Sequence, residues 1–257
     1  MTPTDASRRS SRGFLPRGLA FALLPLTVTL CATADEARPG IFRITPLRPV
    51  AELRALALAE SPPAEPGPFR RVELVEPTRL DPTIRLDIRY ATASNFLSTP
   101  VYTEARAFLQ KEAAEALVRA HRALRPSGFG LLIHDAYRPW WVTKLFWDAT
   151  PVERRAFVAD PAKGSRHNRG CAVDLTLARL EDGQAVEMPS LYDEMTERSS
   201  PSYPGGSQEA RRLRDLLRAA MEREGFTVFE SEWWHFDYSG WREYPILNVA
   251  FERIARP

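Results

Sequence analysis

Cysteine is scarce in this sequence, since a chain of 257 residues contains only two. Cys31 lies in an N-terminal segment that we expect to be removed, which leaves Cys171 alone. A single cysteine excludes an intramolecular disulfide. It also argues against a purely structural zinc site, because such sites have four ligands and these are often cysteines. If a metal contributes to this protein, other residue types must bind it.

The N-terminal region lacks an apolar segment of membrane-spanning length. Its apolar stretch, Gly18 to Leu30, has 13 residues and is too short to span a bilayer. Four arginines precede this stretch, and Ala32-Thr33-Ala34 follows it as a small-x-small cleavage site. This order predicts a signal peptide over residues 1–34 and export to the periplasm or another extracytoplasmic compartment. The alternative is a short buried N-terminal helix.

Neither sign of charge is in large excess. The sequence has 35 Lys and Arg against 33 Asp and Glu, which gives a formal net charge of +2. Residues 1–34 contain four arginines and one aspartate, so the rest of the chain has a formal net charge of −1. A near-neutral chain has no general electrostatic attraction for nucleic acids or anionic membranes. We therefore expect no nucleic-acid partner and no stable membrane insertion after cleavage of the signal peptide.

Proline, in contrast, is abundant, with 22 residues. Four of them fall close together at Pro62, Pro63, Pro66 and Pro68. This composition predicts a Pro-rich arm or linker over residues 35–68 that lies on the surface. The sequence shows no internal repeat and no second large hydrophobic block, so residues 69–257 are predicted to form one domain.

Strands are predicted where apolar residues alternate with polar ones or where β-branched and aromatic residues concentrate. The predicted strands are Ile84 to Tyr90, Gly130 to Tyr137, Cys171 to Leu180 and Thr227 to Tyr238. Asp182-Gly183 predicts a hairpin turn from the third of these into Ala185–Met188.

Helical periodicity covers two longer segments. Thr103 to Leu124 is predicted as a helix with Thr103 as its N-cap, and Gln208 to Glu224 as a helix closed by Gly225. Shorter helices are expected at 140–147 and at 151–158, the latter beginning at Pro151. This mixed order with a hairpin indicates an α+β fold, in which helices flank a mostly antiparallel sheet.

A first group of metal-ligand residue types occurs at His167 and Asp174, seven residues apart. The two side chains can reach one ion if the chain turns between them, and Gly170 permits such a turn. Beyond the glycine, strand alternation places Ala172, Asp174 and Thr176 on one face. The alternative is a histidine in a surface loop followed by an aspartate that forms a salt bridge.

A second group is Glu232 and His235, separated by two tryptophans. A hydrolytic zinc site needs one more neutral imidazole and a carboxylate that acts as a general base. In a straight strand these two side chains would point to opposite faces, so a shared site requires a bend or bulge near Glu232. The alternative is an aromatic strand with an incidental histidine.

Together the two groups predict a catalytic zinc site. His167, Asp174 and His235 supply three ligands and leave the fourth tetrahedral position for water, which is the arrangement of catalytic rather than structural zinc. One zinc ion per chain is therefore expected. The other two histidines fit less well. We interpret His121 as a surface or packing residue of its helix. We interpret His134 as a core histidine, or as one that contacts the metal ligands without binding the metal.

These residues also resemble a known family. The run from Ser165 to Asp174, followed by Glu232 to His235, is similar to the D-alanyl-D-alanine dipeptidase family of zinc D,D-peptidases (VanX type). The resemblance extends over roughly residues 70–240, and the ordered set of motifs is far more specific than any one of them. The further motifs are Asp87 to Phe96, Pro100 to Tyr102, Asp135 to Pro139 and Gly225 to Thr227.

The resemblance implies a zinc D,D-peptidase (Hedgehog-like) fold and a role for each matching residue. His167, Asp174 and His235 would bind zinc, and Glu232 would be the general base. Arg138 would stabilise the oxyanion, although by itself it would be interpreted as a structural arginine at a strand end. Ser165 would hydrogen-bond the substrate, and Asp193 would bind its free ammonium group. Met188-Pro189-Ser190 departs from the family pattern, which has Met-Gly-Thr there.

The predicted function is zinc-dependent hydrolysis of the dipeptide D-Ala-D-Ala in cell-wall metabolism, with residues 69–257 as the catalytic domain. One alternative is a D,D- or L,D-carboxypeptidase that trims peptidoglycan stem peptides, which the absence of an ammonium-binding Asp193 would favour. An alternative of another class is a catalytically silent zinc-containing binding domain. An intact Glu232 argues against it, because a binding site has no need of a base.

Overall fold

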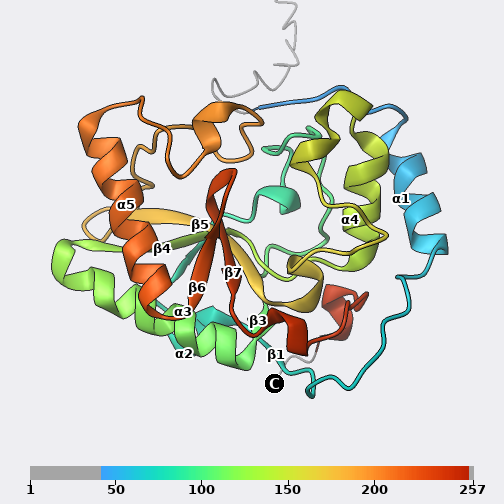
Figure 1. The fold of residues 1–257 in the computed structure, drawn as a ribbon, viewed down its shortest axis with the longest axis horizontal. Coiled ribbons are helices and arrows are strands. Elements are labelled where there is room, and N and C mark those ends of the chain that lie inside the picture. Colours follow the sequence, from blue (N-terminus) through green and yellow to red (C-terminus); the bar gives the residue numbers. More distant parts are fainter. Residues whose placement is uncertain (1–41, 255–257) are drawn as a thin grey trace, which may run out of the picture. The chain divides into compact units, whose positions relative to one another are not determined.

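Five strands form the central sheet of this computed structural model, which describes residues 42–254 (Figure 1). Neighbouring strands β2 and β4 are parallel, and all other neighbours in the sheet are antiparallel. The predicted α+β class with a mostly antiparallel sheet is confirmed, whereas the predicted signal peptide lies outside the described residues. The strands lie side by side as β2 (Arg85–Leu86), β4 (Phe129–Asp135), β5 (Ala172–Arg179), β7 (Glu232–Tyr238) and β6 (Phe226–Phe229).

The helices pack against the sheet and against one another. Helices α3 and α5 contact one another and the sheet, while α1 packs against α4 (Figure 1). None of the described helices is both long and apolar enough to cross a membrane. The α-helices are α1 (Val50–Ala59), α2 (Pro77–Leu80), α3 (Lys111–Leu124), α4 (Trp140–Ala149) and α5 (Gln208–Arg223). The 3-10 helices are Arg89–Ala91, Arg125–Ser127, Val152–Phe157, His167–Arg169, Glu197–Ser199, Trp241–Glu243 and Phe251–Arg253.

Helix α5 illustrates why the sequence folds as it does. Ser207 caps its first turn, because the hydroxyl accepts a hydrogen bond from the amide of Ala210 at 3.0 Å. Its apolar stripe, which includes Leu213, Leu217 and Met221, is buried. The chain then leaves the helix through Gly225, whose φ of +87° is the left-handed conformation expected at a helix C-terminus. The predicted boundaries of this helix are confirmed within one residue.

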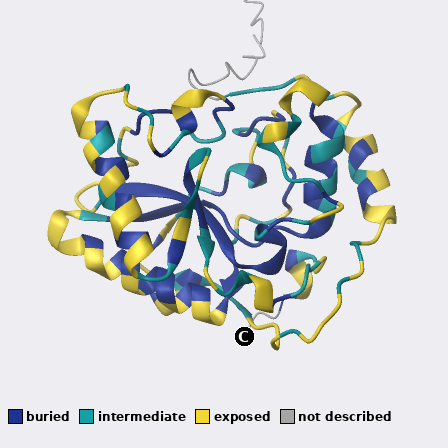
Figure 2. Ribbon diagram, in the orientation of Figure 1, coloured by how far each residue is buried: buried dark blue, intermediate teal, exposed yellow. Residues whose placement is uncertain are grey.

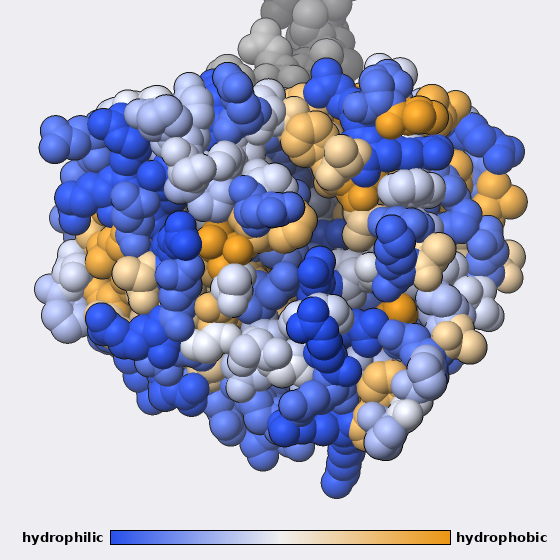
Figure 3. Space-filling model, viewed as in Figure 1, coloured by the Kyte–Doolittle hydropathy of each residue, from blue (hydrophilic) through white to orange (hydrophobic). Residues whose placement is uncertain are grey.

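Burial separates the inside of the fold from its outside. Strands β4 and β5 are buried along almost their whole length, and the helices alternate between buried and exposed turns (Figure 2). On the face seen in Figure 3, hydrophilic side chains predominate and apolar ones occur in small separate groups. The sheet therefore belongs to the core of the fold, and its strand ends provide rigid positions for side chains.

The helix predicted from Thr103 begins later than expected, at Lys111. The preceding residues Leu109–Gln110 form strand β3, which pairs with β1 (Leu74–Val75) in a separate two-stranded sheet. Gln110 is buried there, and its side-chain amide donates to the carbonyl of Arg169 at 2.8 Å. These contacts with distant residues outweigh the local helical pattern. The predicted N-cap at Thr103 was therefore wrong.

The last predicted strand is in fact a hairpin. Thr227 to Tyr238 was expected as one strand, but Phe226–Phe229 (β6) turns at Glu230 and pairs with Glu232–Tyr238 (β7). In the pairing, Val228 lies opposite Phe236 whereas the next residue, Phe229, lies opposite Glu232. This shift in register is an irregularity near Glu232, as the sequence required for a shared site.

Other predicted elements are shorter than expected. Of Ile84 to Tyr90, only Arg85–Leu86 is a strand, because Tyr90 turns into the core and its carbonyl accepts hydrogen bonds from a later loop. The helix expected at 151–158 is a 3-10 helix, and the helix at 140–147 extends to Ala149. The Asp182-Gly183 turn forms, with φ of +71° at Gly183, but the expected strand after it is reduced to one bridge at Ala185.

Within the segment predicted as a Pro-rich arm or linker, the structure has helix α1. Leu53 and Ala57 of this helix are buried against α4. Glu65, further along the segment, forms an ion pair with Arg169 and accepts a hydrogen bond from the amide of Ile246 at 2.7 Å. This helix and these contacts were not predicted from the sequence. They attach the segment to the rest of the described chain.

Candidate active site

One cavity of about 160 Å³ brings together all seven residues that the sequence singled out. They come from the loop after β4, the turn before β5, strands β5 and β7, and the irregular segment 189–196. The cavity is also lined by aromatic residues, among them Tyr90, Phe146 and Phe229. A concave site with a few convergent polar groups is the usual form of a small-molecule site. The seven residues are Arg138, Ser165, His167, Asp174, Asp193, Glu232 and His235.

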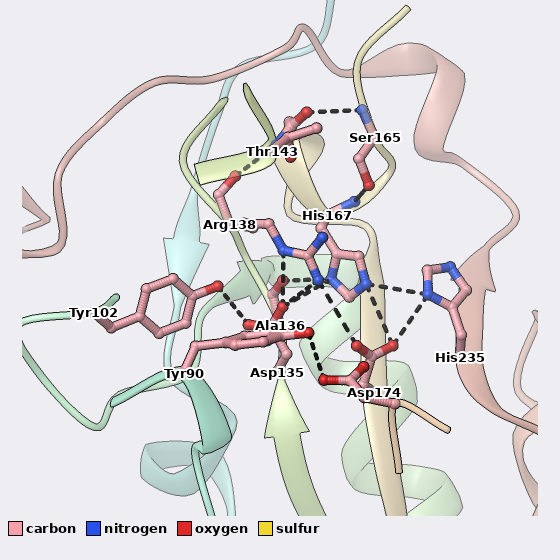
Figure 4. Close-up of polar contacts among 12 residues, drawn as sticks. Tyr90, Tyr102, Asp135, Ala136, Arg138, Thr143, Ser165, His167, Asp174 and His235 are labelled. Carbon is pink, nitrogen blue, oxygen red and sulfur yellow. Dashed lines mark hydrogen bonds and ion pairs between the residues drawn. The ribbon is translucent and has the colours of Figure 1, made fainter. Parts of the chain in front are cut away.

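The three predicted metal ligands converge on one point (Figure 4). His167 Nε2 lies 3.1 Å from His235 Nδ1 and 3.3 Å from Asp174 Oδ1. His235 Nδ1 lies 3.0 Å from the same carboxylate oxygen. All three residues are buried. Two imidazole nitrogens and a carboxylate oxygen so close together form a donor set suited to a divalent metal such as zinc.

Strand register and one turn explain this convergence. Asp174 on β5 lies directly opposite His235 on β7 in the antiparallel pairing. His167 belongs to a 3-10 helix that ends at Gly170, where φ is +68°. The chain therefore reverses at the predicted glycine and returns His167 to the end of β5.

Hydrogen bonds on the far side of each ring select the nitrogen that faces the cluster. His167 Nδ1 lies 2.6 Å from the carbonyl of Ala136, and His235 Nε2 lies 2.9 Å from Asp237 Oδ1. Because a carbonyl or carboxylate can only accept, each of these ring nitrogens must be the N–H donor. The other nitrogen of each ring is then the one available to a metal.

The ligand carboxylate is oriented in a similar way. Asp174 Oδ2 accepts a hydrogen bond from the Tyr192 hydroxyl at 3.1 Å. Asp174 Oδ1 is buried and has no hydrogen-bond partner among the described residues. A buried carboxylate oxygen without such a partner is costly unless a cation occupies the position beside it. The donor set and this oxygen therefore both fit a bound cation.

The pKa values indicate that positive charge is favoured at the same point. Burial opposes the charged form of His235, yet Asp174 and Asp237 raise the pKa of this histidine to about 10. Burial likewise opposes the charged form of Asp174, yet the neighbouring histidines hold the pKa of its carboxyl well below the usual range. The surrounding carboxylates thus stabilise a cation between these groups, whether a proton or a metal.

Glu232 lies at the start of β7, beside the register shift. One of its carboxylate oxygens is 3.8 Å from His235 Nδ1, so the irregularity places both side chains on the same side of the strand. Burial is the main cause that raises the pKa of Glu232 to about 7. A carboxylate with such a pKa is suited to accept and return a proton near neutral pH.

Arg138 is fixed by the carboxylate of Asp135, as Figure 4 shows, and by two aromatic rings. Its Nε and one terminal nitrogen donate to Asp135 Oδ2 at 3.0 and 2.7 Å, and the guanidinium packs over Tyr90 and Phe146. The same terminal nitrogen lies 3.9 Å from Asp174. Asp135 in turn accepts from the Tyr102 hydroxyl at 2.7 Å. Arg138 therefore presents an immobilised positive charge beside the ligand cluster.

Asp193 has an unusual backbone, with φ of +57° for a residue other than glycine. Its carboxylate accepts a hydrogen bond from the Tyr90 hydroxyl at 2.9 Å. Burial, followed by the nearby Asp174 carboxylate, raises the pKa of Asp193 well above its usual range. An arrangement of this kind gains stability when a positively charged group binds next to it.

Ser165 lines the cavity but already has one local contact. Its hydroxyl oxygen accepts a hydrogen bond from the amide of His167 at 3.2 Å. This contact links Ser165 to the backbone of the ligand histidine. The hydroxyl proton is still available for a substrate, so the predicted role of Ser165 is compatible with its position.

Sequence comparison bears on the identity of this site. A family model for the D-Ala-D-Ala dipeptidases (peptidase family M15) matches residues 70–251. The D-alanyl-D-alanine dipeptidase of Escherichia coli K12 is 38% identical over 185 residues, which cover 72% of this chain and 94% of that protein. The chain belongs to the D-Ala-D-Ala dipeptidase family. The predicted family and the prediction of a peptidase are thereby confirmed.

This dipeptidase-family chain is also similar to another curated protein and to solved structures. The D-alanyl-D-alanine dipeptidase of Enterococcus faecium is 37% identical over 66% of this chain and 91% of that protein. Among solved structures, an LdcB LD-carboxypeptidase matches with a TM-score of 0.39 and 19% identity, over 69% of this chain and 72% of that one. VanYB in complex with D-alanine-D-alanine matches with a TM-score of 0.36 and 15% identity, over 55% of this chain and 77% of that one.

Sequence reasoning missed several residues of this dipeptidase-family site. Three of them form hydrogen bonds with predicted site residues: Asp237 with His235, Tyr192 with Asp174, and Asp135 with Arg138. Asp135 was named from the sequence only as part of the Asp135 to Pro139 motif, and for the other two the only sequence signal was proximity to a predicted site residue. His121 and His134 lie outside the cluster. Both are buried and hydrogen-bonded, so the surface interpretation of His121 was wrong and the packing interpretation fits.

Proposed function

We propose that this protein is an exported zinc-dependent dipeptidase that hydrolyses D-Ala-D-Ala in cell-wall metabolism. The observation that carries the proposal is the single cavity in which the His167, Asp174 and His235 ligand atoms meet Glu232 and Arg138. The names of the relatives, which are D-alanyl-D-alanine dipeptidases, support the same substrate.

Zinc is the proposed metal, held by His167, Asp174 and His235. When bound, a zinc ion acts as a Lewis acid and lowers the pKa of a water ligand to about 7. Asp237 and the carbonyl of Ala136 accept from the far nitrogen of each histidine and so orient the other ring nitrogen toward the metal position.

Glu232 is the proposed general base. Its carboxylate lies beside the ligand cluster, and its raised pKa suits it to take a proton from the attacking water. The same group then donates that proton to the nitrogen of the departing D-alanine. The new C–O bond forms first and leaves a negative charge on the former carbonyl oxygen; the C–N bond then breaks as the nitrogen takes the proton, and two D-alanine molecules are the products.

Arg138 is proposed to stabilise the negative oxygen that develops on the scissile carbonyl. The guanidinium is already immobilised by Asp135 and by the rings of Tyr90 and Phe146, so it loses little freedom during the reaction. Loss of one such preorganised donor typically costs about 3–4 kcal/mol in the transition state.

Asp193 is proposed to bind the free ammonium group of the substrate, with Ser165 as a further hydrogen-bonding partner. A longer peptide with an acylated nitrogen at this point would leave a buried carboxylate unpaired, which is unfavourable. This is why the dipeptidase is preferred to a D,D- or L,D-carboxypeptidase, whose substrates carry no free ammonium at that position.

The test is an assay of the purified protein with D-Ala-D-Ala, N-acetyl-D-Ala-D-Ala and a stem pentapeptide, each with and without a chelator. We expect hydrolysis of the free dipeptide alone, abolished by the chelator and restored by zinc. Hydrolysis of the pentapeptide in place of the dipeptide would favour the carboxypeptidase. Metal binding without turnover of any substrate would favour the binding domain.

Export is a separate part of the proposal. The basic, apolar and small-residue order of residues 1–34 supports it. Expression of the whole chain in a Gram-negative host, followed by N-terminal sequencing of the periplasmic fraction, should give a mature protein that begins at Asp35. Recovery of uncleaved protein in the cytoplasm would contradict this part.

A further inference from the structure

Two positively charged residues line the active-site cavity, and the proposed function uses only one of them. Arg138 has a role at the developing oxyanion, whereas Arg166 has none so far. D-Ala-D-Ala carries a carboxylate at one end as well as an ammonium at the other. A site that distinguishes this dipeptide therefore needs a cation for the carboxylate as well as Asp193 for the ammonium.

Arg138 is poorly placed to be that cation. Two of its nitrogens already donate to Asp135, and Asp174 lies 3.9 Å away. Its side chain is only 10% exposed, so its charge is already shared by carboxylates of the protein.

Arg166 is anchored differently. Its guanidinium packs over the ring of Trp241 at 4.9 Å and that of Phe229 at 6.0 Å, while 40% of the side chain is exposed. The nearest carboxylate belongs to Asp237, 3.4 Å from Arg166 Nε. This Nε is buried and has no hydrogen-bond partner among the described residues. Arg166 is thus held by rings yet retains the capacity to bind an anion.

The two ends of the cavity have different neighbours. Asp193 contacts Tyr90 on the side of Arg138, whereas Arg166 contacts Asp237 on the side of His235. A dipeptide whose ammonium pairs with Asp193 and whose peptide carbonyl lies at the ligand cluster directs its carboxylate away from Asp193. We propose that Arg166 binds the C-terminal carboxylate of the dipeptide and so determines specificity for that end. This inference rests on the proposed function.

As a consequence, the enzyme recognises both ends of its substrate. Asp193 selects a free ammonium and Arg166 selects a free carboxylate, so the two requirements act on different chemical groups. An amide or ester of the dipeptide keeps the first interaction and loses the second.

The test compares D-Ala-D-Ala with its C-terminal amide, D-Ala-D-Ala-NH₂, in the zinc-loaded wild type and in Arg166→Gln. Loss of a charge-assisted hydrogen bond corresponds to about a 10- to 100-fold loss of affinity. We therefore expect the variant to raise KM for the free acid by about 10-fold or more and to change KM for the amide less than about 3-fold. Arg166→Lys should retain part of the preference, because the charge remains without the planar fork.

Arg242→Gln is the matched control. This arginine also packs over Trp241, at 4.2 Å, but it does not line the cavity. It should leave the ratio of kcat/KM for acid and amide unchanged. Because both substrates meet the same enzyme preparation, this ratio is independent of any zinc that Arg166→Gln loses.

The outcomes separate the two proposals. An unchanged ratio in Arg166→Gln would overturn the role of Arg166, while hydrolysis of D-Ala-D-Ala by the wild type would leave the proposed function standing. If the wild type hydrolyses neither dipeptide, the proposed function fails first. An equal loss of kcat/KM on the free acid and on the amide would indicate that Arg166 positions Asp237 and His235 instead.

Discussion

Strands β5 and β7 and the segment 189–196 all line the cavity, but they hold their functional side chains by different means. On the strands, Asp174 and His235 face each other because antiparallel pairing places their backbones opposite one another. In the segment, Asp193 reaches the cavity through a left-handed backbone conformation. The segment is fixed to the sheet by side chains, such as the Trp233 indole that donates to Ser190 at 2.9 Å.

The strands therefore carry groups proposed for catalysis, whereas the segment carries a group proposed for substrate selection. A metal and a base need positions fixed to a fraction of an ångström, which paired strands provide. Substrate choice depends on a few side chains that contact the substrate, and loops tolerate changes at such positions. Tyr192 links the two regions, because it belongs to the segment and its hydroxyl donates to the strand residue Asp174. We therefore expect strand variants to abolish the reaction and segment variants to change which substrates react.

The largest effect is expected from His235→Ala, which removes a ligand from β7. The protein should lose its zinc, measured by metal analysis, and kcat/KM should fall by roughly 1,000-fold or more, because the metal supplies several kcal/mol of transition-state stabilisation. His134→Ala is the control, since that buried histidine lies outside the ligand cluster and should leave about one zinc per chain in the folded protein. Full activity of the wild type after metal removal would refute the zinc site.

Glu232→Gln tests the strand side without removing a ligand. The variant should keep zinc and fold, yet kcat should fall by about 10²- to 10⁴-fold, which is the range for loss of a general base. Glu230→Gln, at an exposed carboxylate in the same hairpin, should behave as the wild type. Near-normal turnover in Glu232→Gln would move the role of base to another carboxylate, with Asp135 as the first to test.

Asp193→Ala tests the segment side. N-acetyl-D-Ala-D-Ala should be a poor substrate of the wild type, by about 30-fold or more in kcat/KM, because it leaves a buried carboxylate without its ammonium partner. The variant should lose activity on the free dipeptide while the gap between the two substrates narrows. Zinc content should stay the same. Equal kcat/KM on both substrates in the wild type would reject the role of Asp193 and favour a carboxypeptidase.

The smallest effect is expected at the link between the regions. Tyr192→Phe removes the hydroxyl that orients Asp174 but keeps the ring against Trp234. Zinc affinity should therefore fall by about 10-fold, while the free energy of unfolding should change little. Competition with a chromophoric chelator measures this affinity directly. Tyr238→Phe, in a ring that packs on Phe226 at a distance from the ligands, is the control. An unchanged zinc affinity in Tyr192→Phe would show that the two regions are independent.

Much of this protein could be predicted from its sequence. Local patterns predicted α5, β4 and β5 closely, because the period of apolar residues and the capping residues are properties of the segment alone. The spacing of His167, Gly170 and Asp174 predicted a turn and two ligands, and the turn forms at that glycine. Residue chemistry selected His167, Asp174, Glu232 and His235, and the family resemblance added Arg138, Ser165 and Asp193; all seven line one cavity.

The way in which those residues are held depends on contacts between distant segments. The late start of α3 follows from Gln110, which bonds to the backbone of Arg169 far along the chain. The register shift beside Glu232 arises from pairing between β6 and β7, and Tyr192 reaches Asp174 across 18 residues of sequence. Periodicity within one segment carries no information about such partners, because the free energy that fixes them comes from contacts formed when distant segments pack together.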